Sequence, residues 1–356
     1  MQPVLNKILI VYHRFPPIAE DLKNAFLRLG IDVDIFYTTD YEHWFYRRFI
    51  RTVNRYARTL RLVAKGTDLF RNHPFNLTNY VSSNFEKCFF QSRPDAVFVI
   101  HGLPFGAPYI SNISVPKIGW HLEPRDDIPY LIQNAAPYDI YNSYSQKDVD
   151  LLVGAGFDSR YLCHAVDTNN FFSIPAVEKV FDVTFVGNWS PWRDDAVKAA
   201  LEVTANIALY GSYWKKKSTI PRKVLKRIFK GKEIIGKELN HLYCSSRIVL
   251  NASRVRGSHG LNMRFFEVLA AGSMLLTDAV PELTKHFVPD THLVLYQNSA
   301  ELKILLSELL GNPEKQDRIR HEGQRLVSER HHYDSMALHL LSQFDEILSA
   351  KHHGCA

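Results

Sequence analysis

The sequence predicts an α/β protein built from two Rossmann-like domains, each with a doubly wound parallel sheet. Short apolar segments typical of strands alternate with segments typical of helices, which is the pattern of βαβ units. The alternation stops at a polar stretch over residues 167–179 and then starts again. A chain of 356 residues also exceeds the size at which one hydrophobic core keeps growing, so two domains are expected.

The first half is expected to hold six strands, each an apolar run followed by loop or helix residues. These strands are residues 7–11, 33–36, 96–100, 117–121, 139–142 and 160–163. Two helices are predicted most clearly by glycines that end them, at residues 19–29 before Gly30 and at 145–153 before Gly154 and Gly156.

The second half repeats this order. Its predicted strands are residues 183–186, 206–210, 247–250, 274–277 and 292–295, and its helices are about 194–203, 237–245, 262–271 and 299–310. Residues 313–348 are expected to form two further helices. We therefore predict domains over residues 1–170 and 171–325, and a C-terminal helix within 326–356 that packs back toward the first domain. Ligands of such sheets bind beyond the carboxyl ends of the strands, which predicts an interdomain cleft.

The composition is that of a globular protein, with 46% hydrophobic and 22% charged residues. Its apolar runs are of strand length, so we expect no transmembrane helix. The first residues lead directly into a strand and lack the plan of a signal peptide. Four cysteines without metal or disulfide spacing indicate a reducing cytosol. We expect a cytoplasmic protein.

The net charge of +6 is concentrated in two basic segments. Residues 44–65 carry +7 and residues 214–237 carry +9, which leaves −10 for the rest of the chain. Two basic patches on an acidic body indicate an anionic partner. The second segment is interrupted by Pro221 and is expected to be a loop and a short helix. It binds lipid phosphates or nucleic acid, or is a solvated insertion.

The first basic segment has the spacing of an amphipathic helix. Its apolar residues step by three or four along one face, and arginines flank that face. The apolar residues are Phe45, Phe49, Val53, Tyr56, Leu60 and Val63. Such a helix lies on an anionic membrane surface, or it packs on the domain core and exposes a solvated basic face. The sequence leaves these two readings equal.

Residues 261–277 contain the most informative motif of the chain. Arg264 and Glu267 lie three residues apart at the start of an apolar helix, so they share one helix face. A helix N-terminus beside an arginine suits a phosphate, and a carboxylate one turn later suits the hydroxyls of a ribose. Asn262, just before Arg264, is grouped with them. The segment therefore predicts a site for a nucleotide diphosphate.

Three further segments of the second half contain candidate residues for the same site. Gly187 and Asn188 follow a predicted strand, and Arg193 starts the next helix, where backbone N–H groups can meet a diphosphate. The alternative is an ordinary turn with a surface arginine. Gly211 lies shortly before Trp214. The indole of Trp214 stacks on a nucleobase, or the two residues form a structural turn in which the indole is packed in the core. Asn251 ends a predicted strand and is expected to face the cleft.

Polar groups at strand ends of the first half are candidates for acid–base catalysis. His101, His121 and Glu123 each follow or end a predicted strand. The alternative is that these are hydrogen-bonded loop residues. The Asp-X-Asp triplets at Asp32 and Asp148 lie away from any diphosphate position, so we expect no metal.

In order and spacing, these segments resemble the CgeB-like glycosyltransferases, a GT-B-fold group related to the group 1 (GT4-type) transferases. The resemblance covers most of the chain. It rests on residues 118–127 (IGWHLEPRDD), 185–188 (FVGN), 210–214 (YGSYW), 246–251 (SRIVLN) and 263–267 (MRFFE). Each piece is short, and the specificity lies in their succession.

The resemblance implies a nucleotide-sugar donor held mainly by the second domain. Glu267 would contact the ribose, and Arg193 and Arg264 the diphosphate, whose departure they would stabilise without metal or cofactor. His259 departs from the pattern, because related group 1 enzymes often carry there a glutamate that touches the donor sugar. The group 1 relation favours retention of anomeric configuration. An inverting enzyme would need a general base, for which Glu123 or His101 is expected.

We therefore expect a glycosyltransferase that moves a sugar from a nucleotide-sugar to a glycan, a lipid-linked glycan or another hydroxyl acceptor. It would be cytoplasmic, and peripheral on the inner face of the membrane if residues 44–65 bind lipid. Alternatives are a transferase acting on DNA bases, which ranks lower, and a GT-B-fold sugar-nucleotide epimerase. A silent carbohydrate-binding relative is disfavoured by the intact Arg264 and Glu267 pair.

Overall fold

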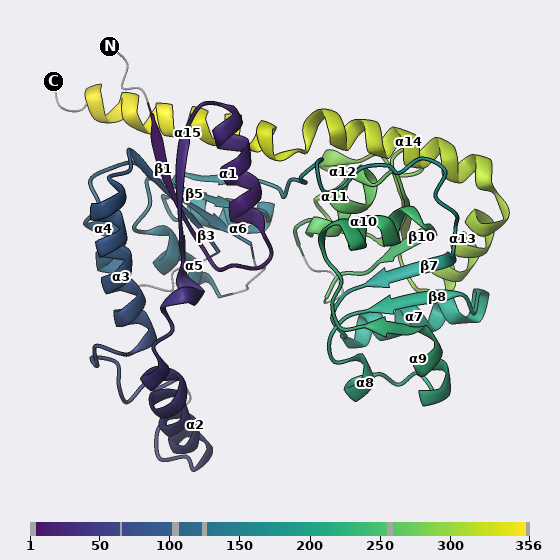
Figure 1. Cartoon of the computed structure of the whole chain (residues 1–356), viewed down its shortest axis with the longest axis horizontal. Coiled ribbons are helices and arrows are strands. Elements are labelled where there is room, and N and C mark those ends of the chain that lie inside the picture. The colour runs from purple at the N-terminus through teal and green to yellow at the C-terminus, as the bar shows by residue number, and fades with distance from the viewer. Residues whose placement is uncertain (1–4, 65, 102–106, 123–126, 255–258, 354–356) are drawn as a thin grey trace. The chain divides into compact units, whose positions relative to one another are not determined.

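The computed structural model describes residues 5–64, 66–101, 107–122, 127–254 and 259–353. The chain forms two compact units (Figure 1). Unit 1 comprises Met1–Leu162 and Met336–Ala356, and unit 2 comprises Cys163–Ser335. The chain thus passes from unit 1 to unit 2 a few residues before the expected boundary at 170, and it returns ten residues or so after the expected boundary at 325.

Unit 1 is built on a six-stranded parallel sheet in the order β2-β1-β3-β4-β5-β6. Its strands are β1 Lys7–Tyr12, β2 Asp32–Tyr37, β3 Ala96–Ile100, β4 Lys117–His121, β5 Ile140–Ser143 and β6 Ser159–Tyr161. Every residue of β3, β4 and β5 is buried, because helices cover both faces of a doubly wound sheet. This burial explains why β3 is a continuous apolar run rather than an alternating one.

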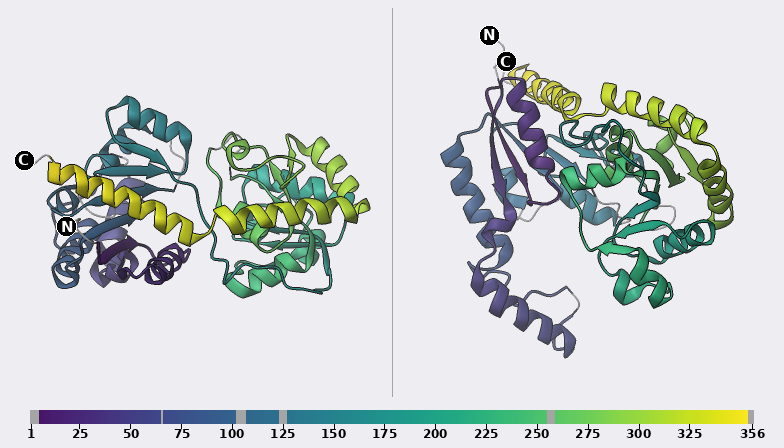
Figure 2. Two further views of the ribbon diagram at one scale, coloured as in Figure 1. Left: turned by 90° about the horizontal axis from the view of Figure 1, so that it is seen from above. Right: turned by 45° about the vertical axis from the view of Figure 1, so that its right-hand side comes forward.

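The helices of unit 1 pack their apolar faces on this sheet. They are α1 Ile18–Arg28, α3 Leu77–Ser92, α4 Ala107–Ser111, α5 Ile128–Ala135 and α6 Gln146–Gly154, with a 3-10 turn at Thr38–Tyr41. The C-terminal helix α15, Tyr333–His353, lies along unit 1 (Figure 2). The amide of Gln343 in α15 pairs with the amide of Asn142 in β5 at 2.8 and 3.1 Å, so this helix is fixed by a buried polar contact.

An arm extends from unit 1 between β2 and α3 (Figure 1). It consists of a π-helix, Tyr46–Ile50, that continues into α2, Arg51–Thr59. The predicted helix is therefore present. Its buried positions are Ile50, Asn54 and Ala57, which are not on the apolar face that the sequence predicted.

Unit 2 repeats the architecture with the strand order β12-β11-β10-β7-β8-β9, again all parallel. The strands are β7 Phe181–Val186, β8 Ile207–Tyr210, β9 Phe229–Gly231, β10 Ser246–Asn251, β11 Met274–Asp278 and β12 Val294–Tyr296. Five of the six were predicted. The sequence did not predict β9, because this short edge strand lies inside the basic segment and lacks an apolar run.

Eight helices of unit 2 are described. They are α7 Pro191–Val203, α8 Trp214–Lys217, α9 Arg222–Ile228, α10 Gly236–Cys244, α11 Met263–Ala270, α12 Leu283–His286, α13 Ser299–Gly311 and α14 Pro313–Arg330. The helices α7 and α11, which follow β7 and β10, begin at the carboxyl edge of the sheet and contribute residues to the predicted site. Side-chain caps fix both starts, since Ser190 accepts from the N–H of Arg193 and Asn262 accepts from the N–H of Arg264.

Candidate functional site

The turn after β7 is held against the turn after β8 without room for side chains. A Cβ atom on Gly211 would lie 1.9 Å from the carbonyl oxygen of Gly187, and Gly211 has a φ of +141°. Only glycine fits there. The same carbonyl of Gly187 accepts a 2.7 Å hydrogen bond from the indole of Trp214, which is fully buried. Trp214 therefore packs in the core of unit 2. Of the two predicted alternatives, this supports a structural turn with a packed indole rather than a surface that stacks on a nucleobase.

Asn188 continues this turn and is occupied by internal hydrogen bonds. Its Oδ1 accepts from the N–H of Ser212 at 2.9 Å. Its backbone oxygen accepts from Nη1 of Arg193 at 2.9 Å. The predicted site residues Gly187, Asn188, Arg193 and Gly211 thus come together as one hydrogen-bonded group at the carboxyl edge of β7 and β8.

Arg193 is a buried arginine, with 7% of its surface exposed. It joins two loops, because its Nε donates to the carbonyl of Ala252 after β10 at 2.9 Å while Nη1 donates to Asn188. Burial lowers the pKa of Arg193 to about 9, and the positive charge of Arg264 adds to this shift, partly opposed by Asp278. Arg193 and Arg264 are therefore close neighbours of like charge.

Arg264 lies in the first turn of α11. Its Nε is buried and has no hydrogen-bond partner among the residues that the structure describes. A buried donor without an acceptor is costly, by about 1–3 kcal/mol and more for a charged group. The position thus favours an anionic acceptor from outside the chain.

Glu267 lies one turn after Arg264 on α11, as the spacing predicts. It is 9% exposed, and burial raises its pKa against the opposing influence of Arg264 and Tyr243. The hydroxyl of Tyr243, from α10, is buried beside it and makes no hydrogen bond of normal geometry within the described part of the chain. The pKa of Tyr243 is raised well above its usual value by burial and then by the charge of Glu267.

Asp278, at the end of β11, completes the group of charges and was given no role by the sequence. Its carboxylate accepts from the N–H of Ser253 at 3.0 Å and from the indole of Trp192 at 3.1 Å. Burial raises its pKa. An acid directly after a predicted strand was the available signal. Its hydrogen bonds anchor the loop that follows β10 to the start of α7.

His259 is connected to a second residue that the sequence missed. Its Nδ1 lies 3.4 Å from Oε1 of Glu282, a buried carboxylate that also accepts from the N–H of Gly260 at 3.0 Å. His259 stands at the position where related enzymes carry a glutamate, and here the carboxylate next to it comes from the start of α12. Spacing alone could not reveal this pairing.

Two predicted donor residues use their side chains inside the protein. Asn251 is buried, and its amide donates to the hydroxyl of Thr277 at 3.1 Å. Asn262 is the N-cap of α11, with its oxygen 3.0 Å from the N–H of Arg264. Both residues order the edge of the sheet from which a ligand would be bound.

The carboxyl edge of the unit 1 sheet carries imidazoles. His101 follows β3 with a φ of +62°, and its N–H donates to the carbonyl of Trp120 at 2.7 Å. His121 ends β4, is buried, and stacks on Tyr141 with ring centroids 6.3 Å apart. His13, which the sequence did not single out, follows β1 and lies 5.3 Å from His101 by ring centroids. Glu123 lies outside the described residues.

Since β1, β3 and β4 are neighbours in the sheet, these three histidines follow adjacent strands. The structure thus brings His101 and His121 to one edge, as predicted. A histidine directly after a predicted strand was the signal that could have found His13.

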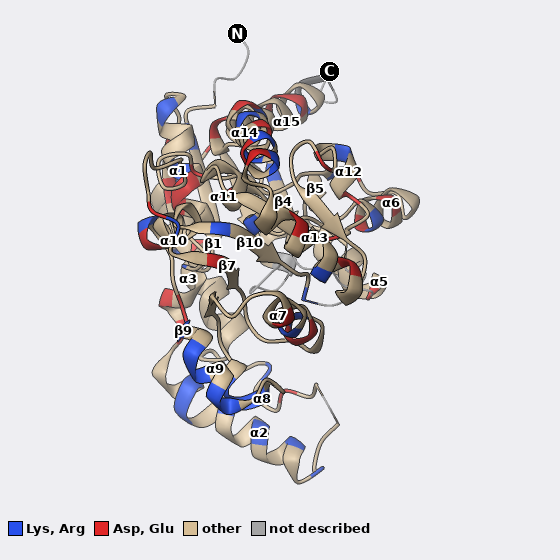
Figure 3. Ribbon diagram, turned by 90° about the vertical axis from the view of Figure 1, so that its right-hand side faces the viewer, with Lys and Arg blue, Asp and Glu red and all other residues tan. Residues whose placement is uncertain are grey.

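Lysine and arginine gather on two surfaces, each in its own unit (Figure 3). In unit 2 they cover α8 and α9. In unit 1 they cover the arm, where the sequence predicted an amphipathic helix. Phe49, Tyr56 and Leu60 of that predicted apolar face are 46%, 56% and 65% exposed, whereas its other three residues, Phe45, Val53 and Val63, are half-buried.

None of the helices among the described residues is long and apolar enough to cross a membrane.

Comparisons with known proteins agree with this architecture. The model of a family described as glycosyl transferase-like matches residues 190–342, most of unit 2. Sucrose-phosphate synthase from Thermosynechococcus elongatus has a TM-score of 0.69 to this chain at 12% identity, covering 97% of this chain and all of the other. A search among curated proteins finds no match.

Two further solved structures cover nearly the whole chain. HepE from Anabaena in complex with UDP-glucose has a TM-score of 0.63 at 13% identity, over 97% of this chain and 99% of the other. A glycosyltransferase from Rickettsia africae has a TM-score of 0.67 at 12% identity, over the same shares of the two chains. The predicted GT-B fold of two Rossmann-like parallel-sheet domains is confirmed, and unit 2 matches a family described as glycosyl transferase-like.

Proposed function

We propose that this protein transfers a sugar from a nucleotide-sugar donor, bound by unit 2, to an acceptor hydroxyl. The observation that carries the proposal is the pair formed by the buried Arg193 and the half-buried Arg264, whose Nε atom is buried. Two like charges lie close together, and Nε of Arg264 has no acceptor within the described part of the chain. A diphosphate supplies the missing negative charge and acceptor oxygens, so we infer that it binds there.

The local backbone supports the same placement. Arg193 and Arg264 lie in the first turns of α7 and α11, where the positive end of the helix dipole favours an anion. Glu267 lies one turn further along α11, at a distance that suits the hydroxyls of the ribose. Solved relatives of the same fold contain UDP and UDP-glucose, which supports a nucleotide-sugar as the donor class.

The chemical step follows from this charge arrangement. As the bond between the sugar and the diphosphate breaks, negative charge grows on the leaving oxygen, and fixed cations stabilise it. We propose that Arg193 and Arg264 supply this charge, that no divalent metal is needed on the diphosphate, and that the sugar is transferred with retention. We propose that His259, whose ring lies 3.4 Å from Glu282, contacts the donor sugar.

Nucleotide binding by unit 2 tests the proposal most directly. We expect one nucleotide or nucleotide-sugar in a panel to raise the melting temperature. A ligand at about one hundred times its Kd stabilises the folded protein by about 2.7 kcal/mol. The Glu267→Ala variant should lose most of this shift. A panel in which no nucleotide stabilises the wild type would contradict the proposed function.

The identity and configuration of the product then test the reaction. Incubation of the best donor with candidate hydroxyl acceptors should release nucleoside diphosphate and form a glycoside whose anomeric signal in NMR matches that of the donor. Release of the nucleotide without Mg²⁺ or Mn²⁺ should stay within about twofold of the rate with them. An epimerase would instead convert the donor without any acceptor.

We further propose that the arm of unit 1 lies on an anionic membrane surface, which supports a lipid-linked acceptor. Six arginines flank its exposed aromatic and aliphatic side chains. They are Arg47, Arg48, Arg51, Arg55, Arg58 and Arg61. Basic residues near an anionic leaflet contribute about 1 kcal/mol each, and inserted apolar side chains add to this. The exposure of Trp44, Tyr56 and Leu60 favours this reading over packing on the core.

Co-sedimentation with vesicles tests the arm. Wild type should bind vesicles containing phosphatidylserine and not neutral vesicles, and binding should weaken with salt. The double variant Arg55→Glu/Arg58→Glu should bind several-fold more weakly, and the matched variant Arg222→Glu/Arg227→Glu on α9 controls for total charge. Equal loss in both would point to nonspecific charge, and binding to duplex DNA at low salt would favour a nucleic-acid acceptor.

A further inference from the structure

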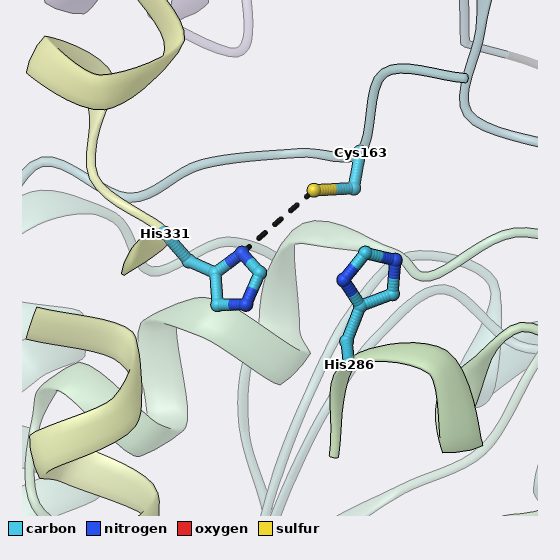
Figure 4. Close-up of side chains that lie close together, drawn as sticks. All are labelled: Cys163, His286 and His331. Carbon is cyan, nitrogen blue, oxygen red and sulfur yellow. Dashed lines mark hydrogen bonds between the residues drawn. The ribbon is translucent and has the colours of Figure 1, made fainter. Parts of the chain in front are cut away.

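Three potential metal ligands that are not among the proposed donor residues converge in unit 2. The Sγ atom of Cys163 lies 3.8 Å from Nδ1 of His331. One ligand atom from each of Cys163, His286 and His331 lies within 4.8 Å of the other two. Figure 4 shows the three side chains pointing toward one another.

The three residues come from distant parts of the sequence. Cys163 is the first residue of unit 2, His286 ends α12, and His331 caps the C-terminus of α14. Cys163 and His331 therefore sit on the two segments by which the chain enters and leaves this unit. These two segments are also joined next to Cys163 and His331, because Val166 and His332 form a parallel β-bridge. No short spacing motif links these positions, which is why the sequence showed no metal site.

The surroundings hold the imidazoles in the form that binds metals. Burial lowers the pKa of His331 to about 4, and burial also lowers the pKa of His286. Both rings are therefore neutral at pH 7, with nitrogen lone pairs available. Phe266 and Phe287 flank the His331 ring at centroid distances of 5.3 and 5.7 Å, which orients it and limits access of water.

We propose that Cys163, His286 and His331 bind a borderline-soft divalent cation such as Zn²⁺, with water as a fourth ligand. One thiolate and two imidazoles are a common ligand set for Zn²⁺. Bond lengths of about 2.3 Å to sulfur and 2.0 Å to nitrogen place tetrahedral ligands roughly 3.3–3.6 Å apart. Closing the site thus needs side-chain shifts on the order of 1 Å from the present separations.

Binding would release the thiol proton of Cys163 to solvent and leave a thiolate on the metal. Burial raises the pKa of this thiol to about 12 in the metal-free protein, so the proton leaves only when the cation takes its place. The metal would tie α12 to both segments that lead to unit 1. Its role is structural, and it is independent of the donor diphosphate.

Co²⁺ substitution and Zn²⁺ titration of the full chain test the site. After chelation and dialysis, wild type should bind one equivalent of Co²⁺ and develop the thiolate-to-metal absorption and visible bands of a tetrahedral site. Zn²⁺ at about one hundred times its Kd should raise the melting temperature by roughly 5 °C or more. Cys163→Ser should lose the charge-transfer absorption, and His286→Gln and His331→Gln should lose the tetrahedral bands.

Two matched variants control for other ligands. Cys88→Ser changes a half-buried thiol of unit 1. His292→Gln changes a histidine whose ring also lies near Phe287, at 6.5 Å, but whose Nδ1 accepts from a backbone N–H. Both should keep the Co²⁺ spectrum. Persistence of the charge-transfer absorption in Cys163→Ser, or no stoichiometric binding by wild type, would overturn the proposal.

A measurement on wild type alone guards against variants that fail to fold. Zn²⁺ should slow alkylation of Cys163 at least tenfold, measured by peptide mass mapping, while Cys88 reacts at an unchanged rate. Equal protection of both thiols, or protection of neither, would contradict the metal site. No nucleotide or sugar enters these experiments, so their failure would leave the proposed transferase activity untouched.

Discussion

In each unit an arginine follows the first strand closely, and the two arginines have opposite environments. In unit 1, Arg14 follows β1, is exposed and pairs with Asp40 at 2.6 Å, and this contact raises its pKa. In unit 2, Arg193 follows β7, is buried, and has its pKa lowered by burial and by Arg264. An exposed arginine that is already paired with a carboxylate has little unsatisfied charge with which to bind an anionic ligand. A buried arginine beside a second one favours an incoming anion.

The carboxyl edges of the two sheets also differ in the charged and titratable side chains that they carry. Unit 1 places three histidines after neighbouring strands, whereas unit 2 places two arginines beside the buried acids Glu267 and Asp278. One architecture therefore carries two kinds of chemistry, since the fold fixes where an edge lies and the side chains decide what it binds. The following predictions test this contrast.

Removal of Arg264 should have the largest effect. We expect Arg264→Ala to lower kcat by about 10²–10³-fold, because a fixed donor to the departing diphosphate is lost. Arg14→Ala, its counterpart in unit 1, should leave steady-state kinetics within about twofold. Similar losses in the two variants would remove the distinction between the turns.

Removal of Glu267 should mainly weaken the donor complex. We expect Glu267→Ala to raise the Kd of the nucleotide by about 10–100-fold, the loss expected for charge-assisted hydrogen bonds to two hydroxyls, and to lower turnover at subsaturating donor concentrations by a similar factor. Calorimetry with a ribonucleotide and its 2′,3′-dideoxy analogue measures this. Wild type should discriminate between the two ligands, and the variant should not.

The buried charge of Glu267 should cost stability in the free protein. Burial raises its pKa in the folded state, so the folded protein holds this proton more tightly than the unfolded chain does. Wild type is therefore penalised above the unfolded pKa, and the penalty shrinks as pH falls toward it. We expect Glu267→Gln to melt a few degrees higher than wild type at pH 7, by thermal denaturation.

The pH dependence supplies the control for that comparison. The difference in melting temperature between Glu267→Gln and wild type should narrow as the pH falls from 7 toward 4.5, the ordinary pKa of a glutamate. A constant difference over this range would mean that packing, and not ionisation of the carboxyl, separates the two proteins.

The smallest kinetic effect is expected at unit 1. If the transfer proceeds with retention, as we propose, it places no demand for a general base on this unit, so His101→Asn should lower kcat by less than about tenfold and leave nucleotide affinity unchanged. Asparagine tolerates the positive φ of this position, which keeps the backbone intact. A loss of 10² or more would favour inversion with His101 as the base.

Local patterns explain why much of the fold was predictable. Strands β3, β4 and β11 are buried along their whole length, so β3 is entirely apolar and the other two contain apolar residues at their centre or start. The relation of Arg264 to Glu267 is set within one helix turn. The close approach at Gly211 was equally visible as a glycine directly after a strand.

Long-range contacts explain what could not be predicted. The sequence placed Phe49, Tyr56 and Leu60 on one apolar face, left open to a membrane or to the core, and the residues that the arm buries are Ile50, Asn54 and Ala57. Asn54 is accommodated because its amide donates to Asp68 at 2.6 Å and its oxygen accepts from the N–H of Leu69. A polar residue can be buried once a distant partner satisfies it, and residue spacing does not register such a partner.

The sequence by itself determined two doubly wound sheets, a helix with Arg264 and Glu267 on one face, and a basic arm, because each depends on neighbours within a few residues. Only the tertiary structure decided that Arg193 lies buried beside Arg264, that Glu282 partners His259, and that Cys163, His286 and His331 converge. These arrangements depend on burial and on charges brought together from separate strands and helices, and such quantities exist only in the folded chain.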